Sequence, residues 1–280
     1  MSFFKIFNIA RILSLDVVLG AVVSSLFIAK YMGLLIPVSI TLALGECVWL
    51  IYTLDHLSDA RAIPHQANTP RHRFHQKYFK ALSIIFILVS IGGLITLSFL
   101  PLRLIVWGCI IMLFVALYFW SIQFLELKTL FHKEVVSALL YCLGIFLPAY
   151  YANSASLPTS VYLLFAQYLG MALCNLLLLA WYEKDVDTKD QHTSLAVVVN
   201  ERYLRHVIQI CLLLVYGLAV VSFLYFNAEP EFRFVQFIVL GMATSLQAIL
   251  SFPAFFSAKE LYRSLADAIF FFPLIYLLLP

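Results

Sequence analysis

The stretch WLIYTLDHLSDARAIPHQANTPRHRFHQKYFK, Trp49 to Lys80, contains the strongest pattern in the chain. A long apolar run leads into it and ends at two carboxylates, Asp55 and Asp59. Their spacing of four residues places both on one helix face, because four residues advance a helix by slightly more than one turn. Cationic and imidazole side chains follow at once: Arg61, His65, Arg71, His72, Arg73, His75, Lys77 and Lys80. Carboxylates followed by cations at one helix end are expected where a metal ion and an anionic ligand meet.

The composition places the chain among polytopic membrane proteins. Of its 280 residues, 63% are hydrophobic and 12% are charged, whereas soluble domains carry about 25% charged residues. Runs long enough to cross about 30 Å of hydrocarbon as helix occur at 11–32, 35–55, 79–100, 102–124, 134–152, 159–182, 205–226, 233–256 and 264–279. We therefore predict one all-α domain over residues 1–280, with nine transmembrane helices and a short amphipathic lead-in on the membrane surface.

The basic residues set the expected orientation. With a cytoplasmic N-terminus, fifteen of the 18 Lys and Arg residues fall at one membrane face and three at the other. Cytoplasmic loops carry such an excess of positive charge. All seven histidines also lie on or near that side. We expect a multi-pass protein of a bacterial inner (plasma) membrane whose functional face is cytoplasmic.

A second acidic pair repeats the first. In NLLLLAWYEKDVDTKDQHTSL, residues 175–195, Glu183 and Asp187 are again four residues apart at the cytoplasmic end of an expected helix. Asn175 lies further in on the same stripe. Four expected helices separate the two pairs, as they would in a parallel internal repeat of four helices followed by one added helix. Because both pairs flank the long cytoplasmic connections, two halves of one site explain them better than interfacial charge balance does.

Five other acidic residues beside the motifs or within the expected spans call for an interpretation. Asp185 and Asp190 stand beside the second pair but on other helix faces. Glu46, at mid-span, is either a functional group or a protonated structural acid that bridges helices, and Asp16 is a functional candidate at membrane depth. Asp267 either completes a cavity or caps a helix start. We expect the cap, because carboxylates are favoured in a first helical turn.

The two acidic motifs resemble those of the UbiA-type intramembrane prenyltransferases, and the resemblance extends over nearly the whole chain. That family has nine helices, with one acidic motif at the end of the second helix and another at the end of the sixth. Asp55 and Asp59 match the acid positions of the first motif, and Glu183 and Asp187 match those of the second. The step Ser194-Leu195 follows at the family's distance.

Three departures from the family pattern suggest a diverged member. The chain has Ile51 where the first motif of the family has Asn, and its second motif begins with Glu183 rather than Asp. The stretch TPRHRF, residues 69–74, replaces the usual Arg-Pro stretch. Because the side chain of Ile51 cannot ligate a metal, the number of bound metal ions is open.

The resemblance implies Mg²⁺-dependent transfer of a prenyl group from a polyprenyl diphosphate to a lipophilic acceptor. The implied metal ligands are Asp55, Asp59, Glu183 and Asp187. The cations expected on the diphosphate are Arg61, Arg71, Arg73, Lys133 and Lys184. We expect Arg71 or Arg73 to be foremost, because a guanidinium binds phosphate oxygens in pairs. The aromatic stretches ALYFWSIQF (116–124) and YFNAEPEFRF (225–234) could line a tunnel for the isoprenoid tail.

The main alternative is a transporter or lipid-binding membrane protein without chemistry. Acids at the mouth of the bundle favour an enzyme acting on a diphosphate, whereas acids at the midplane favour a carrier. A histidine-ligated iron oxygenase is disfavoured because only His72 and His75 are closely spaced. The net charge of +3 gives no indication of nucleic acid. The five cysteines lie in apolar segments without a CxxC motif, so we expect them in the core, without disulfides or zinc.

Overall fold

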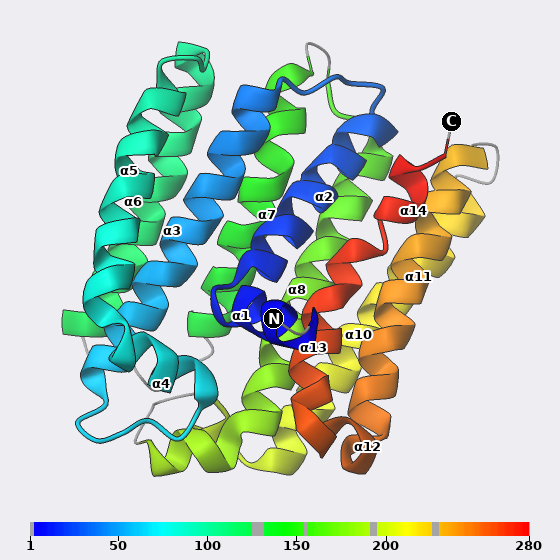
Figure 1. The fold of residues 1–280 in the computed structure, drawn as a ribbon. Coiled ribbons are helices and arrows are strands. Elements are labelled where there is room, and N and C mark those ends of the chain that lie inside the picture. Colours follow the sequence, from blue (N-terminus) through cyan, green and yellow to red (C-terminus); the bar gives the residue numbers. More distant parts are fainter. Residues whose placement is uncertain (1–2, 125–131, 154–155, 191–194, 226–229, 280) are drawn as a thin grey trace.

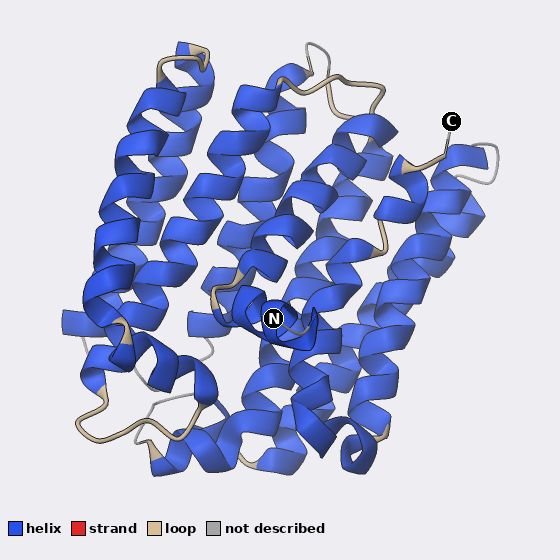
Figure 2. Ribbon diagram, in the orientation of Figure 1, coloured by secondary structure: helices blue, strands red, loops and turns tan. Residues whose placement is uncertain are grey.

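The computed structural model describes residues 3–124, 132–153, 156–190, 195–225 and 230–279, and the regular elements in these ranges are all helices (Figure 2). In chain order they are α1 (Phe3–Ile12), α2 (Leu15–Tyr31), α3 (Val38–Ala62), α4 (Pro70–Lys77), α5 (Phe79–Leu97), α6 (Leu102–Phe124), α7 (His132–Ala152), α8 (Thr159–Lys189), α9 (Leu195–Val198), α10 (Glu201–Tyr225), α11 (Pro230–Ser251), α12 (Pro253–Ser257), η1 (Ala258–Glu260), α13 (Leu261–Ala268), η2 (Ile269–Phe271) and α14 (Leu274–Leu277).

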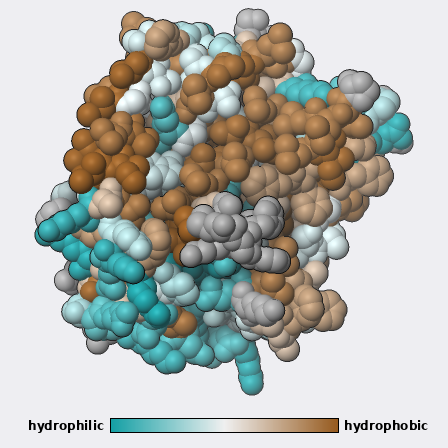
Figure 3. Space-filling model, viewed as in Figure 1, coloured by the Kyte–Doolittle hydropathy of each residue, from teal (hydrophilic) through white to brown (hydrophobic). Residues whose placement is uncertain are grey.

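Seven of the described helices are long and apolar enough to cross a membrane, namely α3, α5, α6, α7, α8, α10 and α11. They lie side by side along one common direction (Figure 1). Apolar side chains cover much of the visible face, and the largest hydrophilic area lies at the lower end of the view, which carries α4 (Figure 3). An all-α polytopic membrane fold, as predicted from the composition, is therefore confirmed.

Two of the nine predicted spans differ from the seven long helices. The first, predicted at 11–32, corresponds to α2, which has 17 residues. The last, predicted as one helix over 264–279, is divided into α13, η2 and α14. Pro273 lies between η2 and α14. Proline interrupts a helix because it lacks an N–H and clashes with the preceding helical turn. The divided segment packs along α2 and α11 (Figure 1). At Gly20 of α2 a Cβ would lie only 3.0 Å from the Cβ of Phe270, so glycine permits this approach.

The cation-rich stretch after α3 contains a helix rather than only a loop. Thr69 accepts a hydrogen bond from the backbone N–H of His72 at 3.1 Å, and Pro70 occupies the first helical position of α4. Threonine before proline is a common helix start. The helix packs against α3 and α1, so it holds the basic residues of this stretch close to the end of α3.

The tightest packing joins α8, α10 and α11. A Cβ at Gly170 of α8 would lie 2.6 Å from Val215 Cγ2 of α10, so only glycine fits there without displacement. Between α8 and α11, the fully buried Gln167 and Gln236 donate to each other's side-chain oxygens at 2.6 and 3.2 Å. This reciprocal pair satisfies both amides away from water.

The cysteines divide between two environments. All five are free thiols in the structure. Cys142 and Cys174 are buried in the core. By contrast, Cys47 and Cys109 are exposed and line a cavity, so the prediction that all five belong to the core was wrong for these two. Hydropathy could not separate the two cases, because a cavity wall inside a membrane protein is as apolar as its core.

Candidate functional site

A large cavity lies between α3, α5, α6 and α7. Its volume is about 580 Å³, and aliphatic side chains make up most of its wall. Asp55, close to the C-terminal end of α3, and Lys133, at the start of α7, line it together. Ser137 Oγ donates to Tyr118 Oη at 3.2 Å in the same wall. The cavity is therefore an apolar chamber with two carboxylates, Glu46 and Asp55, and the cation Lys133 on its lining.

The first acidic pair lies where α3, α4 and α7 meet. Asp55 Oδ2 lies 3.8 Å from His56 Nδ1, and Asp59 Oδ2 lies 3.9 Å from His72 Nε2. Asp55 and Asp59 also exert the largest electrostatic effects on Lys133. The predicted pair and the predicted cation of α7 are thus brought together by the fold.

Arg71 is the predicted cation with an unused donor inside the protein. Its Nε is buried and has no hydrogen-bond partner among the described residues. Burial lowers the pKa of its guanidinium, and the nearby Arg263 lowers it further, whereas Glu183 and Asp55 raise it. A buried donor without an acceptor is costly, so this nitrogen is suited to receive an anionic ligand.

Four of the five predicted cations do not line the large cavity: Arg61, Arg71, Arg73 and Lys184. Arg73 braces its own loop, because its Nε donates to the Ala67 carbonyl at 3.2 Å and its Nη2 donates to the Asn68 carbonyl at 3.1 Å. Arg61 is exposed in the last turn of α3. Of the two arginines expected foremost, the fold favours Arg71.

The second acidic pair has a partner that we did not predict. Arg263 of α13 binds Glu183 through Nε at 2.9 Å and also through Nη2. Both side chains are largely buried, with 8% and 12% of their surfaces exposed. Asp187, one turn further along α8, is buried as well. Glu183 is therefore engaged in a two-point ion pair.

The two acidic pairs differ in what they leave for a metal ion. Among the described residues, no group of three or more His, Cys, Asp or Glu side chains is arranged to hold a metal. Mg²⁺ commonly uses only one or two carboxylates together with substrate phosphates and water. The pair Asp55 and Asp59 fits that pattern, whereas Glu183 is already bound by Arg263.

Asp267 does not cap a helix, and that expectation was wrong. It is the seventh residue of the eight in α13, far from the first turn. Asn175 Nδ2 donates to Asp267 Oδ1 at 2.9 Å. Asn175 and Glu183, predicted on one stripe of α8, therefore both contact α13. The spacing of four residues between Arg263 and Asp267 matches that of the acidic pairs and could have identified them as one face.

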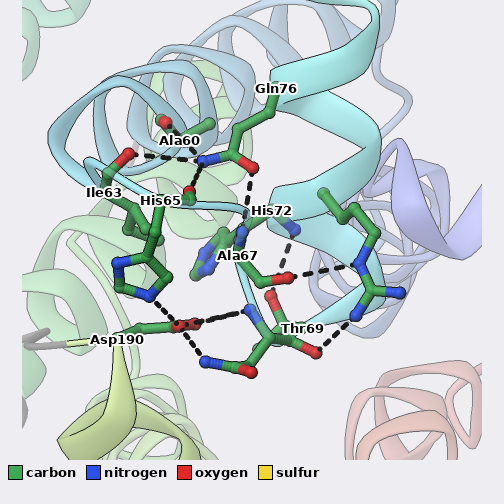
Figure 4. A network of polar contacts seen from close by, with 10 residues as sticks. Ala60, Ile63, His65, Ala67, Thr69, His72, Gln76 and Asp190 are labelled. Atoms are coloured by element: carbon green, nitrogen blue, oxygen red, sulfur yellow. Dashed lines mark hydrogen bonds and ion pairs between the residues drawn. The ribbon is translucent and has the colours of Figure 1, made fainter.

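Asp190 ties the end of α8 to the stretch between α3 and α4 (Figure 4). Its carboxylate accepts from the backbone N of Asn68 at 3.1 Å and from Asn68 Nδ2 at 2.5 Å, and His65 Nε2 lies 3.3 Å away. Gln76 braces the same loop from α4, accepting from Ala67 N at 3.0 Å and donating to the His65 carbonyl at 2.9 Å. The sequence pattern gives Asp190 no role in the second motif. Its partners Asn68 and His65 lie 122 and 125 residues earlier in the chain, so no local pattern indicates that Asp190 anchors this loop.

Glu46 bridges two helices, as one of our two interpretations proposed. Its Oε1 accepts from Thr96 Oγ1 of α5 at 3.2 Å, and the residue also lines the large cavity. Asp16 accepts from the backbone N of Val17 at 3.0 Å. Six of the 15 acidic residues lie near the ends of α3 and α8, whereas Glu46 lies at mid-span of α3.

The aromatic lining is smaller than expected. Tyr118 and Phe119 of the first aromatic stretch line the cavity. In the second stretch, residues 226–229 lie outside the described ranges, and Phe232 and Phe234 belong to or pack on the core instead. Ser194, the first residue of the predicted Ser-Leu step, also lies outside the described residues.

Comparison of the chain with protein-family models, curated proteins and solved structures found no match. The resemblance to the prenyltransferase family therefore stays a prediction.

Proposed function

We propose that the protein transfers a prenyl group from a polyprenyl diphosphate to a lipophilic acceptor within the membrane. One observation carries the proposal: the apolar cavity of about 580 Å³ has Asp55 and Lys133 on its wall. A hydrocarbon tail would occupy the apolar part, and an anionic headgroup would lie at the end where the charged residues gather. Pockets that are largely apolar with a few convergent polar groups are the usual form of a ligand site.

The charged residues have separate tasks in this proposal. Lys133 and Arg71 would bind the diphosphate oxygens and stabilise the charge that develops as the allylic C–O bond breaks. Asp55 and Asp59 would hold Mg²⁺, which supplies further charge neutralisation when bound. Glu183 and Asp187 remain the predicted second metal pair, although the ion pair with Arg263 weakens that role for Glu183. Arg61, Arg73 and Lys184 would act through the wider positive field.

The proposed topology has nine crossings, with α2 and the divided segment α13–η2–α14 added to the seven long helices. Two groups of four helices would form the parallel repeat, and the divided segment would be the ninth crossing. The bias of Lys and Arg supports a cytoplasmic location for the end that carries α4. A bacterial inner membrane is the setting we propose.

A non-catalytic lipid-binding protein or transporter is the second candidate. Glu46 favours it, because this acid lines the cavity at mid-span, where a carrier would have its binding site. The ion pair between Glu183 and Arg263 also favours it, because it occupies a carboxylate that the enzyme would use.

Thermal stabilisation by geranylgeranyl diphosphate, with and without Mg²⁺, tests the proposal. Ligand at about a hundred times its Kd stabilises by about 2.7 kcal/mol, and we expect this shift to require both Mg²⁺ and Asp55. Asp55→Ala should abolish it. Asp185→Ala is the matched control, because Asp185 is an exposed acid of α8 and should leave the shift intact. Equal stabilisation of wild type and Asp55→Ala would contradict the site, and no stabilisation by any prenyl diphosphate would favour the second candidate.

A further inference from the structure

A second and much smaller cavity adjoins the large one. Its volume is about 30 Å³, and we call it the side chamber. It is lined from α2, α3, α7, α8, α13 and η2. Tyr52, Ser137, Tyr141 and Leu176 line both cavities. The two cavities therefore adjoin at these four side chains.

The polar groups of the side chamber include two hydrogen-bond acceptors from different helices. Asp267 of α13 and Asn175 of α8 both line it, and Asn175 Nδ2 donates to Asp267 Oδ1. Asn175 is only 6% exposed, and its Oδ1 is buried with no hydrogen-bond partner in the described part of the chain. A buried carbonyl oxygen without a donor is costly, and native proteins almost always satisfy it. The occupant of the side chamber should therefore supply a donor.

The lining of the chamber disfavours an anionic occupant. Asp267 lies on its wall, and none of its lining residues is a Lys, Arg or His. Arg71 and Arg263 act on Asp267 without lining the chamber. A phosphate in the side chamber would face this carboxylate directly, whereas a hydroxyl group would be attracted.

The volume limits the size of the group. A cavity of about one probe sphere or somewhat more holds a single water molecule, so about 30 Å³ admits one water-sized group and no ring. We propose that the side chamber binds the hydroxyl group of an otherwise apolar ligand seated in the large cavity. The single O–H donates to Asn175 Oδ1, and Asp267 holds that amide in place by accepting from Asn175 Nδ2. If the proposed transfer reaction is correct, that ligand is the acceptor molecule. This last assignment rests on the proposed function, whereas the hydroxyl site does not.

Competition between neutral probes tests the site in protein reconstituted into lipid nanodiscs without Mg²⁺. A long-chain alcohol bearing a diazirine is photocoupled to the protein, and the labelled peptides are mapped by mass spectrometry. Unlabelled dodecanol and its methyl ether then compete with it. The ether has no O–H to donate, so we expect dodecanol to compete about tenfold better, the value of about one buried hydrogen bond. Asp267→Leu and Asn175→Leu should each remove most of this preference.

Asp185→Leu is the matched control, because Asp185 is an exposed acid of the same helix as Asn175 that lines neither cavity, and it should keep the tenfold preference. Asn175→Leu serves if Asp267→Leu fails to fold. Equal competition by alcohol and ether in wild type would mean that the chamber holds only a structural water, and the proposal would be wrong. A preference that survives both leucine variants would overturn it as well. Because the probes carry no phosphate, the result is independent of diphosphate binding.

Discussion

Two regions of the bundle are built from equally apolar helices but are packed in opposite ways. In α8 and α11, 50% of the residues in the apolar 18-residue stretch of the helix are buried inside the protein. In α5 and α6 the corresponding shares are only 6% and 11%. The helix α8 packs closely against α10 at Gly170 and is hydrogen-bonded to α11 through the paired Gln167 and Gln236. The helices α5 and α6, together with α3 and α7, surround the large cavity.

This difference shows how a membrane protein separates stability from binding. Lipid is as apolar as leucine, so apolar side chains alone do not draw helices together. Close packing at small residues and interhelical hydrogen bonds do, and both are present between α8, α10 and α11. The other region leaves space that a ligand can fill. Substitutions in the packed region should therefore change stability, whereas substitutions around the cavity should change binding.

The largest expected effect is at the ion pair that fastens α13 to the packed region. Glu183→Gln leaves Arg263 buried without a counter-charge and should lower the free energy of unfolding by about 3–5 kcal/mol. Chemical denaturation in detergent measures it. The double variant Glu183→Gln/Arg263→Gln should recover much of the loss, because it removes the isolated charge. Equal losses in the single and double variants would show that the ion pair does not hold α13.

The next effect separates the two regions by the same substitution. Gly170→Ala forces a Cβ to within 2.6 Å of Val215 Cγ2 and should cost about 1–3 kcal/mol as overpacking does. Gly108→Ala in α6 is the control, because no atom lies within 4 Å of its added Cβ. That variant should be neutral or slightly stabilised, since alanine favours helix over glycine. If thermal unfolding shifts equally in both variants, the contrast in packing is absent.

Filling the cavity should affect binding without affecting stability. Gly108 lines the cavity and has room for a side chain. Gly108→Phe should therefore reduce affinity for geranylgeranyl diphosphate at least tenfold, about 1.4 kcal/mol, while the unfolding midpoint without ligand stays close to wild type. Ligand-induced thermal shifts measure both quantities. Unchanged affinity would place the isoprenoid tail elsewhere.

The smallest effect is a pH dependence at His75 of α4. Burial lowers the pKa of His75 below its ordinary 6.5. The hydrogen bond to the Arg71 carbonyl opposes this shift, and the charge of the Arg71 guanidinium adds to it. The unfolded chain therefore binds the proton more readily than the folded protein does. The stability contributed by neutral His75 is complete above pH 6.5 and is lost as the pH falls below that value toward the folded pKa. His75→Gln should flatten this part of the stability profile measured between pH 7.5 and 5, and an unchanged profile would contradict the assignment.

Local patterns in the sequence predicted what depends on local geometry. The helical course of α3 through Asp55 and Asp59 follows from their spacing and from the apolar run before them. Thr69 and Pro70 form a recognisable helix start in the sequence, so α4 was also predictable. The density of cations in that stretch suggested a loop instead. The division of the last segment could also be anticipated from Pro273. Length and hydropathy alone predicted one continuous helix there.

The sequence by itself determined the class of the protein, because composition fixes whether a chain can remain in water and helix periodicity fixes which side chains share a face. Only the tertiary structure decided the partners of the acidic residues. Glu183 meets Arg263 and Asn175 meets Asp267 across 80 and 92 residues of chain, and Asp190 meets Asn68 across 122. Such contacts depend on how helices of similar hydropathy pack against one another, and packing depends on shape between distant segments rather than on any local pattern.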